Sequence, residues 1–298
     1  MKTNSLKAWL LAARPKTLSG AAVPVMIGLA LAYNDAQQYD GEVFKCGAAL
    51  LCLFFSFAMQ IDANFINDFY DFAKGTDDVE TRLGPRRACA QGWVTLDAMK
   101  KAIAITTIIA CLIGLPLALY GGMEMILIGI LCVLFAFLYT TFFSYLGLGD
   151  VLVLIFFGLI PVSCTYYVQL HEVTWQVLIA STACGLVIDA LLLVNNFRDR
   201  DNDREAGKNT IIVRMGAEAG LHLYLFVGIG AILLGGVFLM NGHYLAFLLP
   251  LIYLALHIVT FLKMKRIYQG KALNLILGET ARNIFIYGLL VSLGILLV

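Results

Sequence analysis

Long uninterrupted runs of apolar residues dominate this chain, and the polar residues gather between them. A helix needs about 20 mainly apolar residues to cross a bilayer. The runs are continuous rather than alternating, which favours helices over the strands of a membrane barrel. We therefore expect an all-α membrane protein that forms one domain over residues 1–298. The nine predicted transmembrane helices cover about 17–34, 45–66, 101–121, 124–143, 150–170, 174–196, 219–240, 243–263 and 277–298.

Composition agrees with this pattern. Hydrophobic residues make up 60% of the chain and charged residues 14%, against about 25% charged residues in ordinary soluble domains. A soluble protein of this size could not bury so much apolar surface. The formal net charge is only +1, which excludes the strongly basic surface of a nucleic-acid-binding protein. Membrane lipid is the expected surrounding, and nothing in the sequence implies a protein partner.

The distribution of Lys and Arg orients the predicted helices. Nearly all of them lie in 1–16, 67–100, 197–218 and 264–276, which alternate with segments almost free of basic residues. By the positive-inside rule these four segments are cytoplasmic. We expect a protein of the inner (cytoplasmic) membrane with its N-terminus in the cytoplasm and its C-terminus outside. Residues 1–16 are expected to form an amphipathic lead-in at the membrane interface.

A short polar motif occurs twice. NDFYD at 67–71 and NNFRD at 195–199 both read Asn-[Asp/Asn]-Phe-x-Asp. Each follows an apolar run at a predicted cytoplasmic helix end, and each precedes an acidic, glycine-containing loop. A recurrence in matching topological positions indicates duplicated helical units.

The spacing within the motifs has chemical meaning. Side chains four residues apart share a face of a helix, as Asn67 and Asp71 do in the first motif. In the second motif Asn195, Asp199 and Asp203 share one face, whereas Asp201 points away from it. Two clusters of oxygen donors facing each other would need a cation between them. Hard oxygen ligands favour Mg²⁺, which is commonly completed by substrate phosphates.

Basic residues accompany both motifs and allow two interpretations. They could bind phosphate oxygens, or they could be solvated anchors of the positive-inside kind. Phosphate binding beside an Mg²⁺ site would stabilise a departing diphosphate. The residues concerned are Arg82, Arg86, Arg87, Arg198, Arg204 and Lys208.

NDFYDFAKGTD and NNFRDRDNDREAGKNT resemble the two aspartate-rich motifs of the UbiA superfamily of intramembrane aromatic prenyltransferases. The resemblance implies nine transmembrane helices around a central cavity, with Mg²⁺ and a prenyl diphosphate bound by both motifs. It assigns metal binding, directly or through the diphosphate, to Asn67, Asp68, Asp71, Asp77, Asn195, Asp199 and Asp203.

Further stretches are similar to the 1,4-dihydroxy-2-naphthoate polyprenyltransferases of menaquinone synthesis. They are RPKTLSGAAVPVMIG (14–28), KGTD (74–77), RLGPRRACAQG (82–92), LGLGD (146–150) and AGKNTIIVRMG (206–216). This resemblance implies transfer of a polyprenyl group from polyprenyl diphosphate to the naphthoate ring, with decarboxylation, giving demethylmenaquinone. It also implies diphosphate contacts from Arg82 and Lys208. Asp71, Asp199 and Tyr139 are the implied catalytic residues, with Tyr139 lining the cavity.

Some features depart from these patterns. YTTFFSYLGLGD at 139–150 lacks the Gly-Pro and the basic residue expected near this loop. Asp62 and Asp189 lie inside apolar runs, and Asp189 could contact the acceptor or form a polar contact between helices. Two alternative functions remain at this stage. One is the same donor with another aromatic acceptor, such as 4-hydroxybenzoate or homogentisate. The other is a cation-coupled transporter.

Overall fold

The computed structural model describes residues 1–38, 43–75 and 82–297. Within these ranges, nine helical segments are long and apolar enough to cross a membrane, and no β-strand is found. The predicted all-α membrane fold is confirmed. The segments are Leu6–Ala36, Cys46–Ala73, Leu96–Gly121, Glu124–Phe143, Gly149–Leu170, Trp175–Glu205, Ala217–Met240, Tyr244–Ile267 and Leu273–Leu296.

Several segments are built from more than one helical element. The short elements η1 and η2 are 3₁₀ turns, and η3 and η4 are π turns. In chain order the elements are α1 Leu6–Ala13, η1 Pro15–Thr17, α2 Leu18–Ala36, α3 Cys46–Ala73, α4 Leu96–Gly114, η2 Leu115–Leu117, α5 Ala118–Gly121, α6 Glu124–Leu138, η3 Tyr139–Phe143, α7 Gly149–Val153, η4 Leu154–Leu159, α8 Ile160–Leu170, α9 Trp175–Glu205, α10 Ile211–Met215, α11 Ala217–Leu234, α12 Val237–Met240, α13 Tyr244–Leu248, α14 Leu251–Ile267 and α15 Leu273–Leu296.

Most interruptions have a cause in the sequence. Proline removes a backbone donor and clashes with the preceding turn, and Pro116, Pro161 and Pro250 each lie where one element gives way to the next. The pair Gly235–Gly236 separates α11 from α12. The expected N-terminal lead-in is a separate helix, α1, which ends at Arg14 in the left-handed region with φ 50°.

The two helices that carry the repeated motif extend beyond their apolar runs. α3 continues to Ala73 and α9 to Glu205, whereas the hydrophobic pattern predicted ends near 66 and 196. Each helix stops only at a following glycine, Gly75 with φ +72° and Gly207 with φ +71°. Glycine adopts this left-handed conformation without the steric cost of a Cβ and so ends a helix well. Both motifs therefore lie on helix rather than in loops.

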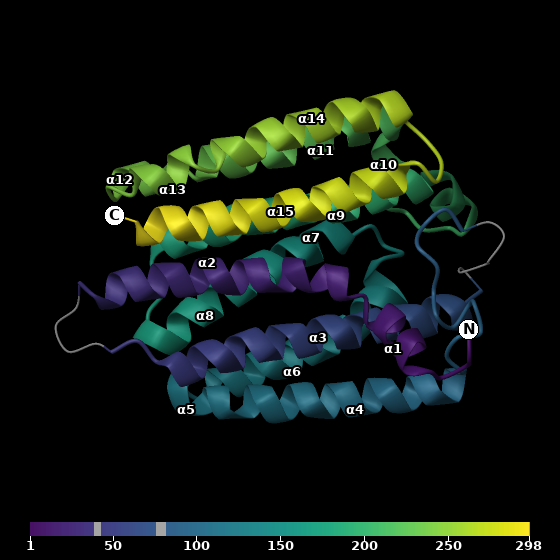
Figure 1. Ribbon diagram of the computed structural model, residues 1–298, viewed down its shortest axis with the longest axis horizontal. Coiled ribbons are helices and arrows are strands. Elements are labelled where there is room, and N and C mark those ends of the chain that lie inside the picture. The colour runs from purple at the N-terminus through teal and green to yellow at the C-terminus, as the bar shows by residue number, and fades with distance from the viewer. Residues whose placement is uncertain (39–42, 76–81, 298) are drawn as a thin grey trace.

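The helices run roughly side by side in one elongated bundle (Figure 1). α2 packs against α3, α8 and α15, while α9 packs against α11, α15 and η4. The C-terminal ends of α3 and α9 lie at the same end of the bundle as the N-terminus, on the right in Figure 1. The C-terminus lies at the opposite end, as an odd number of membrane crossings requires.

α9 is the most enclosed of the nine segments. Two thirds of its apolar window is buried, against 6% for the segment Glu124–Phe143. Small residues allow η4 to approach it closely: a Cβ at Gly158 would lie 2.6 Å from the Cα of Gly185. Close backbone contact through small residues is a common source of helix association in membranes. The second motif therefore extends from a central helix that neighbours hold on several sides.

Candidate active site

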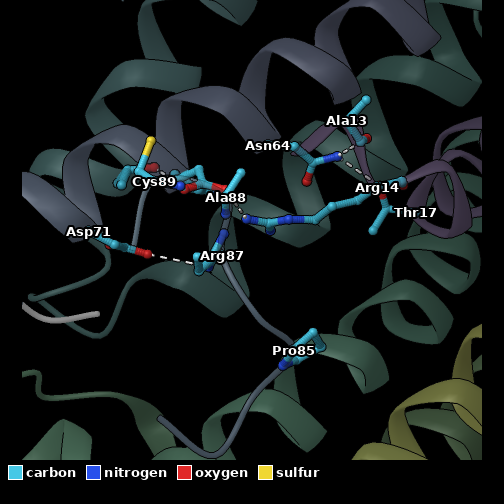
Figure 2. Close-up of polar contacts among 12 residues, drawn as sticks. Ala13, Arg14, Thr17, Asn64, Asp71, Pro85, Arg87, Ala88 and Cys89 are labelled. Atoms are coloured by element: carbon cyan, nitrogen blue, oxygen red, sulfur yellow. Dashed lines mark hydrogen bonds and ion pairs between the residues drawn. The ribbon is translucent and has the colours of Figure 1, made fainter. Parts of the chain in front are cut away.

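The first motif lies on the last turns of α3. The Asn67 side-chain oxygen accepts a hydrogen bond from the hydroxyl of Thr140. One turn later, Asp71 forms an ion pair with Arg87 at 3.2 Å between Oδ2 and Nη2 (Figure 2). Both side chains of the pair are largely shielded from solvent. Asn67 and Asp71 occupy one helical face, so the geometry expected from their spacing is present.

Asp68 holds a different set of partners. Its side chain is fully buried, and its two oxygens accept hydrogen bonds from the backbone N–H groups of Ala88 and Cys89, both at 2.9 Å. Nη2 of Arg14 lies 4.0 Å from Oδ2. Asp68 therefore fixes the segment after α3 against that helix. Metal binding by Asp68, directly or through the diphosphate, stays a prediction beside this anchoring role.

The second motif has its own cation within α9. Arg198 forms a bidentate pair with Asp199, with Nε–Oδ1 at 2.8 Å and Nη2–Oδ2 at 2.6 Å. Its Nη1 donates to Asn274 of α15 at 2.9 Å. Asn274 in turn donates to the carbonyl of Leu83, in the segment that follows the first motif. This chain of contacts connects the second motif to the loop after the first.

The remaining acids of α9 divide as the helical spacing predicts. Asp203 is half-buried, whereas the side chain of Asp201 is 67% exposed and pairs loosely with Arg204 at 3.7 Å. Asp201 is thus a solvated neighbour, and that prediction is confirmed. Asn195 uses its amide nitrogen to donate to the Leu191 carbonyl of its own helix.

Electrostatic contacts join the two motifs. Asp71 on α3 interacts with the charges of Lys208 and Arg82. Asp203 on α9 interacts with Lys208, with Asp199 and with Asp71 itself. Carboxylates from both helices therefore share one positively charged neighbourhood. Asp77, the remaining acid of the expected ligand set, lies outside the described residues.

Arg82 and Lys208, the expected diphosphate contacts, both lie near carboxylates of the motifs. Nε of Arg82 donates to the Pro85 carbonyl at 2.7 Å. Gly84 lets two guanidinium groups approach, since a Cβ there would lie 2.7 Å from Nη2 of Arg198 and 3.2 Å from Nη2 of Arg82. Burial lowers the pKa of Arg82 from its ordinary value, although the nearby Asp199 acts in the opposite direction.

The donor set fits Mg²⁺ and does not form a finished metal cage. In the described ranges, no group of three or more His, Cys, Asp or Glu side chains is placed to hold a metal ion. The oxygens of Asp71, Asp199 and Asp203 come from two helices and are balanced by cations. Mg²⁺ typically binds through one or two carboxylates and completes its coordination with water and substrate phosphates. The residues present suit that mode of binding.

The family model for the UbiA prenyltransferase family matches residues 21–289. The chain belongs to the UbiA prenyltransferase family. It is 39% identical over 219 residues to a 1,4-dihydroxy-2-naphthoate octaprenyltransferase of Escherichia coli, covering 70% of this chain and 69% of that protein. A protein of the same name from Mycobacterium tuberculosis is 34% identical, with 74% of each chain covered. A UbiA prenyltransferase domain-containing protein 1 homolog of Drosophila melanogaster is 31% identical over 96% of this chain and 78% of its own.

Solved UbiA structures share the fold. A UbiA homolog from Aeropyrum pernix superposes with a TM-score of 0.69 at 16% identity, covering 94% of this chain and 97% of that one. A homolog from Archaeoglobus fulgidus bound to GPP and Mg²⁺ gives 0.62 at 17% identity, covering 96% and 99%. The predicted superfamily and the predicted enzyme class, a prenyltransferase, are therefore confirmed.

The loop that lacks a basic residue in this UbiA prenyltransferase receives two from elsewhere. Nζ of Lys74, just after α3, donates to the Thr141 carbonyl at 2.8 Å and lies 4.4 Å from the centre of the Tyr145 ring. Lys208 lies 5.3 Å from the same ring centre. Cation–π contacts of this kind are attractive. Lys74 and Lys208, one beside each motif, thus both contact the 139–150 segment.

The sequence did not predict that four residues of this polar region contact the motifs or their neighbours. They are Arg14, Arg87, Arg198 and Asn274. Only Arg87 and Arg198 were among the candidate phosphate contacts, and both instead pair with motif carboxylates. The signal for Arg14 was its place in RPKTLSG, one of the stretches that carry the resemblance. Nothing local in the sequence distinguishes Asn274.

Tyr139 lies at the turn where α6 passes into η3. Its hydroxyl lies 3.7 Å from the position that a Cβ on Gly149 would take. Carboxylates of both motifs, Asp71 and Asp203, act electrostatically on it. Aromatic rings cluster nearby, with Phe135 stacked on Phe143 at 5.6 Å and close to Phe156 at 4.9 Å. Aromatic faces stabilise nearby cations, which suits chemistry that develops positive charge on carbon.

Proposed function

We propose that this enzyme transfers a polyprenyl group from polyprenyl diphosphate to 1,4-dihydroxy-2-naphthoate, with decarboxylation, giving the quinol form of demethylmenaquinone. The observation that carries the proposal is the convergence of both motifs, since Lys208 acts electrostatically on both Asp71 and Asp203, and Asp71 also acts on Asp203. Relatives at 34–39% identity that are named for this acceptor support the choice of naphthoate. The structures of UbiA homologs with GPP or DMAPP support a prenyl diphosphate donor.

The residues of this chain divide the work of the reaction. Lys208 and Arg82 would bind oxygens of the diphosphate and offset the negative charge that grows as it departs. Asp71, Asp199 and Asp203, with the amides of Asn67 and Asn195, would hold the metal, and Asp77 is proposed as an additional ligand. Bound Mg²⁺ would supply Lewis-acid neutralisation of the diphosphate.

The allylic C–O bond of the donor breaks with both electrons leaving on the diphosphate. The electron-rich ring of the acceptor then supplies the pair for the new C–C bond. Its carboxylate leaves as CO₂, and the pair of the broken C–C bond stays on the ring and restores its aromaticity. Tyr139 and the aromatic rings around it would stabilise the allylic cation through their π faces. Apolar helix surfaces would exclude water from that cation, which water would otherwise capture.

We further propose that this end of the bundle faces the cytoplasm. The N-terminus and the ends of α3 and α9 lie together (Figure 1), and the segments near them carry most of the Lys and Arg. The prenyl chain of the donor would lie between the helices, in contact with membrane lipid. The inner (cytoplasmic) membrane is the location that this orientation supports.

The test is prenylation by the purified full-length protein in detergent. Geranyl diphosphate and Mg²⁺ are supplied with equal amounts of 1,4-dihydroxy-2-naphthoate, 4-hydroxybenzoate and homogentisate, and products are identified by mass spectrometry. We expect a decarboxylated, prenylated naphthalene product that disappears with EDTA and returns with added Mg²⁺. A product on another acceptor alone would overturn the acceptor assignment. Wild-type turnover in both Asp71→Ala and Asp199→Ala would overturn the proposed site.

A further inference from the structure

A second pair of acids lies deeper in the bundle, apart from the two motifs. The side chains of Asp150 on α7 and Asp189 on α9 lie within hydrogen-bonding reach of each other, so the two carboxyl groups form a pair. Asp189 is only 6% exposed. One oxygen of each residue, Oδ1 in both cases, is buried without a hydrogen-bond partner among the described residues. Buried polar atoms of this kind are uncommon and call for an explanation.

A structural role does not account for the two unpartnered oxygens. Asp62 shows what a structural acid in this protein looks like: it is fully buried, and its two oxygens accept hydrogen bonds from the hydroxyls of Thr106 and Thr107. A buried carboxyl oxygen without a hydrogen-bond donor is costly, and acids within membrane segments are usually functional. For Oδ1 of Asp150 and of Asp189, no group among the described residues donates a hydrogen bond.

The position of the pair connects it to the reaction centre. The Tyr139 hydroxyl is influenced by Asp150 and Asp189, and also by Asp71 and Asp203 of the motifs. Asp189 precedes Asp203 on α9 by 14 residues, which corresponds to about 21 Å along the helix and about 40° around it. Asp189 and Asp203 therefore lie on nearly the same face of α9, and Tyr139 is within electrostatic reach of both.

We propose that Asp150 and Asp189 form the subsite that binds a phenolic hydroxyl group of the aromatic acceptor. This inference rests on the proposed function, whose acceptor carries two hydroxyl groups and a carboxylate. A hydrogen bond between two carboxyl groups requires a proton on one of them, so the pair retains one negative charge. The free oxygens accept hydrogen bonds from O–H donors, while the charge repels a carboxylate. The 4-hydroxyl group is farther from the carboxylate than the 1-hydroxyl group is, so the acceptor presents its 4-hydroxyl to the pair and directs its carboxylate elsewhere.

The experiment measures binding of two ligands that differ by one hydroxyl group. The dissociation constants of 1,4-dihydroxy-2-naphthoate and 1-hydroxy-2-naphthoate are determined for the wild type, Asp150→Asn and Asp189→Asn. Because a site built for a hydroxyl leaves buried polar atoms unpaired when that hydroxyl is missing, the wild type should prefer the dihydroxy compound about tenfold or more. In the two variants we expect this preference to fall to about threefold or less.

Asp62→Asn is the matched control, because it neutralises another buried membrane carboxyl that the subsite does not use. It should keep the wild-type preference. Binding of geranyl diphosphate with Mg²⁺ should remain within about twofold of wild type in all three variants, which also shows that they are folded. If Asp189→Asn fails to fold, Asp150→Asn carries the test, since Asp150 is partly exposed.

The possible outcomes separate the two proposals. An undiminished preference in folded Asp150→Asn overturns the subsite, while product formation by the wild type keeps the proposed function. If the wild type binds geranyl diphosphate and neither naphthoate, the proposed acceptor is wrong and the subsite falls with it. A reduced preference in the pair variants, together with the wild-type value in Asp62→Asn, supports the subsite.

Discussion

The two copies of the motif have the same spacing on their helices and quite different surroundings. On α3, Asp71 pairs with an arginine 16 residues away, in the loop that follows the helix. On α9, Asp199 pairs with the arginine directly before it, and that arginine is almost fully buried. The position after the first Asn is Asp68 in one copy, where it binds the backbone of the loop, and Asn196 in the other.

This difference separates what the repeat provides from what each half adds. The repeat provides an amide and a carboxylate on one helical face at a helix end capped by glycine. The first half adds a loop fastened by Asp68, while the second adds a rigid central helix braced by α15 through Asn274. Different contacts therefore hold the same pattern of candidate ligands in the two copies. Single substitutions can test which features both copies need and which occur in only one of them.

The largest effect is expected from the final Asp of the motif, which is Asp71 in the first copy and Asp199 in the second. Asp199→Ala should lower kcat/KM by about 100-fold to 1,000-fold, because it removes a charge placed to act on the diphosphate site. Asp201→Ala, two residues away on the exposed face, should stay within about twofold. Steady-state prenylation of the two variants checks this. Equal losses would show that the helical face does not rank these acids.

The next effect distinguishes Asp68 from its counterpart. Asp68→Ala leaves two buried N–H groups without acceptors and should lower the free energy of unfolding by about 2–4 kcal/mol. Asn196→Ala should change it by less than about 1 kcal/mol. Thermal unfolding of both variants in detergent provides the comparison. If Asp68→Ala is as stable as the wild type but needs a higher Mg²⁺ concentration for activity, the result would support Asp68 as a metal ligand.

A smaller effect should follow from cutting the connection between the halves. Asn274→Ala removes the contacts with Arg198 and with the Leu83 carbonyl, so the KM for geranyl diphosphate should rise about threefold to tenfold. Asn241→Ala is the control, because Asn241 accepts a comparable hydrogen bond from Gln176 near α12, at the opposite end of the bundle. If the two variants have equal KM values for geranyl diphosphate, the contacts of Asn274 do not support binding of the diphosphate.

The smallest effect concerns the caps that the two copies have in common. Gly75→Ala and Gly207→Ala each place a side chain at positive φ and should cost about 1 kcal/mol of unfolding free energy. A Cβ would meet no other atom within 4 Å at either position, so the losses should be similar. Gly20→Ala, inside α2 and equally uncrowded, should not destabilise the protein. Unequal losses in a thermal melt would indicate that one cap has a further role.

Much of the fold could be predicted from the apolar runs. A segment that crosses lipid must form its backbone hydrogen bonds within itself, and it is recognisable as about 20 consecutive apolar residues. The helix ends were less predictable. α3 and α9 continue past the membrane pattern, since polar residues without Gly or Pro do not break a helix. The repeated Asn/Asp spacing correctly predicted that Asp201 is more exposed than Asp199 and Asp203.

By itself, the sequence determined the number of membrane helices, the repeat of the motif and the face that each motif presents, since all three depend on neighbours within a few turns. Only the tertiary structure decided the partners: Thr140 for Asn67, Asn274 for Arg198, and Asp189 for Asp150. These contacts join residues 39 to 76 positions apart. Their pairing depends on how whole helices pack against each other, which no local pattern of residues records.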